Sequence, residues 1–88
     1  MATIEFNPNP AQVDQGVDIK VWTTQASVTR CVVEYSGAAW GSDEVRQWGN
    51  YWWVARRFSQ SGTVNVRATL YDNAGYPIDN GWASLEVR

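Results

Sequence analysis

The sequence has no histidine, one cysteine and no long apolar run, and each shortage excludes a class of protein. A catalytic or metal-binding role for Cys31 would need partners, and without histidine the commonest of these is missing. One cysteine allows no disulfide within the chain, so packing must supply the stability, and we interpret Cys31 as a core thiol. No run approaches the roughly 20 apolar residues that cross a bilayer, and the N-terminus lacks the charged-then-apolar order of a signal peptide. We therefore expect no metal, no cofactor and no membrane insertion.

Positive charge is also scarce. Seven Lys and Arg against nine Asp and Glu give a net charge of −2, which offers no basic surface for nucleic acid. Arg56 and Arg57 beside Trp52 resemble a stacking site for single strands, but no basic stripe continues from them, so we interpret them as solvated arginines.

Features that carry catalysis or bind ions are missing as well. There is no Gly-rich phosphate loop and no nucleophile elbow, and most carboxylates fall at expected turns or outward strand positions. Asp72, Asn73, Asp79 and Asn80 could offer oxygens to calcium, but such residues are typical of turns. The sequence predicts neither an enzyme nor a metal site.

The composition indicates one compact domain spanning residues 1–88. Hydrophobic residues make up 44% of the chain, charged residues only 18%, and aromatic residues 14%. A domain of this length buries roughly 60–65% of its unfolded surface. The balance excludes a disordered chain and favours strands rich in aromatic residues.

Apolar side chains alternate along most of the chain, which is the period of a half-buried strand. The clearest strand follows the Ser59–Gly62 turn, with Val64, Val66, Ala68 and Leu70 on one face. Other strands are expected at 3–6, 17–23, 28–35, 51–58 and 83–87, with a short strand at 38–40 and a polar loop at 41–50 that holds Trp48. In the 28–35 strand we place Cys31, Val33 and Tyr35 inward. Pro8 and Pro10 end the first strand and suit an edge strand that breaks and crosses to the other sheet.

The strand at 51–58 has two registers. If Trp52 and Val54 face inward with Phe58, strict alternation also buries Arg56, and an unpaired buried guanidinium is very costly. If Trp53 and Ala55 face inward instead, a bulge at the two arginines returns Phe58 to the core. We favour the second register, with Trp53 buried, and expect Trp40 to close one end of the domain.

The last strand is expected to form a hairpin with the strand before it, closed by a loop over residues 72–80. Its inward residues are predicted to be Ala83, Leu85 and Val87. Pairing Leu70 with Ala83 places Tyr71 opposite Trp82 on the outer face. The same register places Arg67 opposite Glu86, a favourable charge pair.

The run from Phe58 through Ser59-Gln60-Ser61-Gly62-Thr63, the Val64/Val66/Ala68 strand and the Asp72–Gly75 turn is similar to the "F…G-T-x-x-V-x-A-x-D-x-x-G" run of immunoglobulin-like domains, including fibronectin type III-like and PKD-like modules. The chain departs from them by Val64 in place of a common tyrosine, by lacking a cysteine pair and by lacking a tryptophan on the third strand. The resemblance implies an all-β, antiparallel immunoglobulin-like β-sandwich of about seven strands without a disulfide. It also implies a module of a larger bacterial or phage protein, extracellular, on the cell surface or in a phage virion.

Six tryptophans are more than one small core can hold. Exposed rings of this kind stack on sugars or anchor protein interfaces. The candidate ligand-binding residues are Trp82, Tyr71, Tyr76, Trp22, Trp52 and Arg67. We expect a non-catalytic module that binds a polysaccharide or cell-wall glycan; the alternative is a spacer or assembly domain whose aromatic surface docks on a neighbouring domain or a second copy. A third interpretation, that loops and arginine stems half-cover the rings, stays open.

Overall fold

The structure is a computed structural model that describes residues 1–88, and all of its regular elements are strands. The strands are β1 (Thr3–Asn7), β2 (Gly16–Trp22), β3 (Arg30–Gly37), β4 (Gly41–Trp48), β5 (Tyr51–Arg57), β6 (Gly62–Tyr71) and β7 (Pro77–Val87). Each strand pairs antiparallel with its neighbours in the sheet, so the expected all-β fold of seven antiparallel strands is confirmed. No helix is present that could span a membrane.

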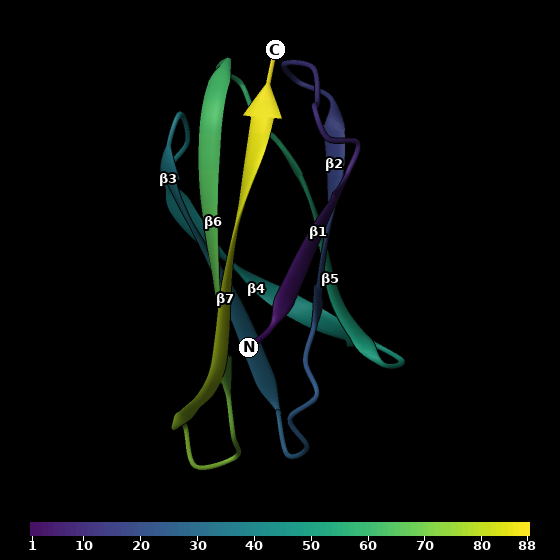
Figure 1. The fold of residues 1–88 in the computed structure, drawn as a ribbon, viewed down its shortest axis with the longest axis vertical. Coiled ribbons are helices and arrows are strands. Elements are labelled where there is room, and N and C mark those ends of the chain that lie inside the picture. Colours follow the sequence, from purple (N-terminus) through teal and green to yellow (C-terminus); the bar gives the residue numbers. More distant parts are fainter.

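The seven strands form one sheet in the order β1-β2-β5-β4-β3-β6-β7. Figure 1 shows β3, β6 and β7 on one side of the domain and β1, β2 and β5 on the other, with β4 crossing between them. The first part of β4 pairs with β3 and its last three residues pair with β5. The sheet is therefore continuous through β4, whereas a sandwich of two separate sheets would be interrupted there.

The two ends of this sheet meet, which nearly closes it. The Ala2 amide donates to the Asn80 carbonyl at 2.8 Å. After the prolines, Ala11 forms a parallel bridge with Val87: its amide donates to the Glu86 carbonyl and its carbonyl accepts from the Arg88 amide, both at 2.8 Å. The expectation that the first strand breaks at the prolines and crosses over is confirmed.

The core lies between the two sides of the sheet and consists of the alternating residues of each strand. Cys31, Val33 and Tyr35 of β3 are buried, as predicted. The inward residues predicted for β6 and β7 are also confirmed: Leu85 and Val87 are buried, and Ala83 packs against the core. Parity along a strand was thus predicted correctly wherever one face was purely apolar.

The prediction of a polar loop at residues 41–50 was wrong, because residues Gly41–Trp48 form β4. Only Val45 of this strand is buried, so most of its side chains can be polar and the sequence shows no apolar alternation. Residues 38–40 form no strand, and Trp40 is 84% exposed instead of closing one end of the domain.

The favoured register of the fifth strand was also wrong. Trp52 and Phe58 are buried, Trp53 faces outward and no bulge occurs in the pairing of β2 with β5. Arg56 does point inward, but it is not unpaired. Its Nη1 donates to Asp43 Oδ2 at 3.0 Å, and its guanidinium lies over the Tyr35 ring at 4.5 Å. The Asp43 carboxylate, from the strand β4 that the sequence did not predict, removes the cost of burying an unpaired guanidinium, which had argued against this register.

The β6–β7 pairing is shifted by four residues from the predicted one. Trp82 lies opposite Arg67, and Tyr71 lies opposite Pro77. The turn is shorter than expected, because the Asp72 amide donates to the Tyr76 carbonyl at 2.9 Å and Asp72 Oδ1 accepts from two amides of the same turn. The β7 strand therefore begins at Pro77, and an irregularity at Leu70/Tyr71 accommodates the turn.

Candidate functional site

The structure separates the six candidate residues. Trp52 is only 6% exposed and packs in the core, so it cannot contact a ligand at the surface. Trp22 lies on the outer face of β2, while Trp82 and Arg67 lie on the outer faces of β7 and β6. Tyr71 lies four residues beyond Arg67 along β6, about 13 Å away at strand spacing. Tyr76 is exposed at the β6–β7 turn. The predicted ledge of Tyr71 beside Trp82 does not form.

The densest group of accessible rings lies on the outer side of β2, β5 and β4, and we call it the aromatic face: Trp22, Tyr51, Trp48 and Trp53. Tyr51 of β5 lies opposite Trp48 of β4 in the sheet. The centres of the Trp22 and Tyr51 rings are 5.7 Å apart, and the rings are tilted by 45°. These three residues form one row across three strands. Trp53 lies in the next row, and its ring stands perpendicular to that of Trp48 at 6.2 Å. The two indoles form a right-angled corner.

Charged groups border this corner. Asp18, Lys20, Trp48, Tyr51 and Trp53 line a shallow hollow of about 340 Å³. The Trp53 indole Nε1 donates to Asp18 Oδ1 at 3.1 Å, which fixes the ring and leaves the other carboxylate oxygen without a partner in the chain. The Lys20 ammonium lies 5.0 Å from the centre of the Tyr51 ring. The hollow thus combines flat apolar rings with one hydrogen-bond acceptor and one donor.

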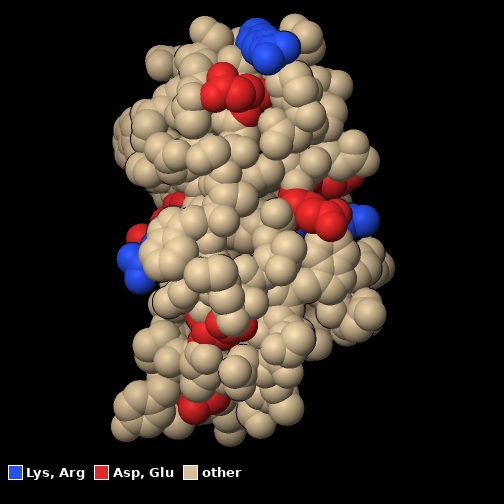
Figure 2. All heavy atoms as spheres, viewed as in Figure 1, with Lys and Arg blue, Asp and Glu red and all other residues tan.

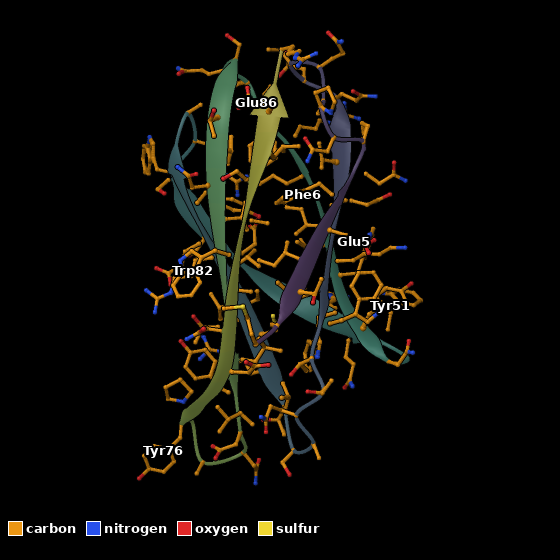
Figure 3. The ribbon with its side chains drawn as sticks, viewed as in Figure 1. Glu5, Phe6, Tyr51, Tyr76, Trp82 and Glu86 are labelled. Atoms are coloured by element: carbon orange, nitrogen blue, oxygen red, sulfur yellow. The ribbon has the colours of Figure 1, made fainter.

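A second exposed group occupies the opposite side. The Arg67 guanidinium lies 5.4 Å from the centre of the Trp82 ring, and both residues line a hollow of about 220 Å³ with Glu34 and Asn65. Figure 3 shows Trp82 and Tyr51 pointing away from each other on opposite sides of the ribbon. One flat ligand therefore cannot contact both groups. On the face drawn in Figure 2 the charged side chains are scattered, with no broad basic area.

Ionisable groups in the interior are arranged for structure. Burial raises the pKa of the Cys31 thiol to about 12, so it stays protonated and is a poor nucleophile. Burial, together with its hydrogen bond to Asp43, raises the pKa of the Tyr35 phenol. No group of three or more acidic or cysteine side chains gathers where it could hold a metal ion.

Sequence reasoning missed Trp48, Tyr51 and Trp53 as partners of Trp22. Trp48 was placed in a loop, and the inverted register turned Trp53 inward. One signal was available: Asp18, Lys20 and Trp22 alternate on one strand, and Tyr51 and Trp53 alternate on another. Two strands that each carry aromatic residues on their polar side predict a shared outer face once their pairing is known.

No family model and no curated protein matches the chain. It is similar in structure to a Cellulomonas fimi endo-beta-1,4-mannanase double mutant, with a TM-score of 0.52 and 21% sequence identity. The match covers all of this chain and 18% of that chain. At this identity the likeness concerns the fold.

Proposed function

We propose that this chain is a non-catalytic glycan-binding module that binds a polysaccharide through the aromatic face. The observation that carries the proposal is the perpendicular Trp48–Trp53 corner beside the Trp22–Tyr51 pair, all on one side of β2, β5 and β4. Sugar rings have apolar faces and hydroxyl edges, so they suit a site in which a flat ring is flanked by polar groups.

The row of rings also suits a chain of sugars. Neighbouring strands lie about 4.8 Å apart, so Trp22, Tyr51 and Trp48 span about 10 Å. A chain crossing the strands would place successive sugars over successive aromatic residues, with the free Asp18 oxygen accepting from a hydroxyl and Lys20 donating to one. Since the hollow is open, it would accept the interior of a polymer as well as its end.

The proposed architecture is an immunoglobulin-like module of a larger protein. Support comes from the grouping of β1, β2 and β5 against β3, β6 and β7, and from the first strand crossing to the other side. A match to 18% of a mannanase chain is what a small accessory domain of a polysaccharide-degrading enzyme would give. Such a module would work outside the cell, at its surface or in a phage virion.

A pull-down on insoluble mannan, cellulose, xylan, chitin and peptidoglycan tests the proposal. We expect retention of the wild-type chain on at least one matrix. Trp48→Ala should lower that retention about tenfold or more, because Trp48 is 56% exposed and belongs to the corner. Trp82→Ala is the matched control, since Trp82 is 59% exposed on the opposite side and should leave retention unchanged. Failure to bind any matrix, or equal retention of both variants, would contradict the proposal.

The second candidate function is an assembly domain that docks through Trp82 and Arg67. Tryptophan and arginine are among the residues enriched at the energetic centres of protein interfaces, and here the Arg67 guanidinium lies 5.4 Å from the centre of the exposed Trp82 ring. Sedimentation at rising concentration checks this function. Self-association that Trp82→Ala abolishes would favour it, and a monomer at every concentration would remove docking on a second copy.

A further inference from the structure

A second hollow lies at one end of the domain, away from the aromatic face. The β3–β4 loop and the end of β5 enclose about 220 Å³, and its principal lining groups are Trp40, Arg56, Arg57, Ser59 and Gln60. Ligand sites for drug-sized molecules measure roughly 300–1,000 Å³, so this hollow suits a single ring-sized group.

The loop that carries Trp40 is fixed against its surroundings. The Ala38 amide donates to the Thr63 carbonyl at 2.9 Å. Gly37 has φ of 85°, and a Cβ there would lie 2.5 Å from the same carbonyl oxygen, so the loop approaches β6 more closely than another residue allows. Trp40 is nevertheless 84% exposed. A large ring is thus exposed two residues beyond a bonded backbone amide, where a ligand can reach it.

The charge of this hollow differs from that of the others. Two arginines and no carboxylate line it, whereas four other hollows on the surface each contain an Asp or Glu. Arg56 is paired with Asp43 just outside the lining, so Arg57, which has no acidic partner, supplies the local excess of positive charge. An anion is the ligand that such a lining attracts.

Both guanidiniums keep donors to spare. Arg56 Nη1 donates to Asp43. Its Nη2 has no partner and lies close to Gly41, the residue after Trp40: a Cβ built on Gly41 would be 3.8 Å from it. Arg57 Nη1 donates to the Asp14 carbonyl at 2.5 Å, which leaves its other nitrogens free. Planar guanidiniums bind carboxylates through paired hydrogen bonds, so a carboxylate matches these donors.

We propose that this hollow is a second binding site that takes a carboxylated sugar, such as a uronic acid unit of an acidic polysaccharide. The carboxylate would pair with Arg57 and the free edge of Arg56, the ring would stack on Trp40, and the hydroxyls would meet Ser59 and Gln60. A peptide with a free C-terminus shares the carboxylate, but it need not carry the hydroxyls that Ser59 and Gln60 would meet. The site is independent of the aromatic face and stands if that face binds nothing.

Calorimetric titration of the 88-residue chain with trigalacturonic acid and with its methyl ester tests the site. We expect the acid to bind at least about tenfold more tightly than the ester, which equals about 1.4 kcal/mol. Added salt should lower the affinity for the acid, because the contact is ionic. Trp40→Ala and Arg57→Gln should each weaken binding of the acid about fivefold or more, while the matched control Arg88→Gln leaves that affinity unchanged.

Three results would overturn the proposal: no detectable binding of the acid, equal binding of acid and ester, or unchanged affinity in both Trp40→Ala and Arg57→Gln. A tripeptide with a free C-terminus is titrated in parallel. If it binds more tightly than the trigalacturonate and its amide does not, the hollow recognises peptide ends and the sugar assignment is wrong. The polysaccharide pull-down with Trp48→Ala uses neutral matrices and another residue, so the two sites succeed or fail separately.

Discussion

Replacing Asp43 by alanine tests the arrangement that sets the register of β5. Asp43 accepts from Arg56 at 3.0 Å and from the Tyr35 hydroxyl at 2.7 Å. Hydrogen bonds to charged groups contribute about 1.5–3 kcal/mol each. The Arg56 and Asp43 side chains are 31% and 29% exposed, so water would partly solvate the partners that the substitution leaves. We therefore expect Asp43→Ala to lower the free energy of unfolding by about 2–3 kcal/mol.

Urea unfolding followed by tryptophan fluorescence measures this loss, with an unchanged dependence on urea showing that the compactness of both states is retained. A double-mutant cycle with Arg56→Leu isolates the pair, and we expect a coupling energy of about 1–2 kcal/mol, between the values for exposed and buried pairs.

The matched control is Glu44→Ala on the same strand. Glu44 bonds Arg30 at 2.5 Å, but that pair is more than half exposed and should contribute much less. If Asp43→Ala cost no more than Glu44→Ala, or if the coupling were zero within error, Arg56 would not depend on Asp43 and the account of the register would be refuted.

Three further predictions concern the core and the closure of the sheet. Leu85→Ala should cost about 2–5 kcal/mol in urea melts, whereas Trp82→Ala should cost less than about 1 kcal/mol; the reverse order would place β7 in the opposite parity. Gly81→Ala should destabilise by about 1–3 kcal/mol, because its Cβ would meet a backbone oxygen before β1; in thermal melts Gly16→Ala, which has open space, is the control. For Cys31, the raised pKa means that the unfolded thiol ionises first as pH rises. The stability it contributes is complete below about pH 9 and is lost toward about pH 12. Urea melts across this range should show a steeper decline for the wild type than for Cys31→Ala, and identical slopes would contradict the assignment.

The sequence was sufficient to predict the strands that have one purely apolar face. Cys31, Val33 and Tyr35 follow period two without exception, and so do Leu85 and Val87, because burial on one face and water on the other leaves a direct trace in the side chains. The break at the prolines was predictable for a related reason, since a residue without an amide hydrogen cannot continue a ladder.

The features that depend on pairing between strands could not be predicted in the same way. The inward position of Arg56 is acceptable only because Asp43 faces it from β4, and β4 itself shows no alternation with a single buried side chain. Predicting the aromatic face required both β4 and the register of β5, because Trp48 contacts Trp53 only when β4 is a strand and Trp53 faces outward. In the last hairpin, parity was fixed by Leu85, but the register depended on how tightly Asp72 closes the turn.

The parallel contact between Ala11 and the end of β7 also has a mechanical consequence. Its hydrogen bonds join the beginning of the chain to its end, with Ala11 and Val13 bonded to Glu86 and Arg88 at 2.8–3.0 Å. In a parallel pair, tension applied through the two ends pulls the partners in opposite directions along their length. The force then acts as shear and loads these bonds together instead of opening them one after another. Because β1 precedes Ala11 and pairs with β2, a domain tethered at both ends would first lose β1 and would then resist extension at this contact.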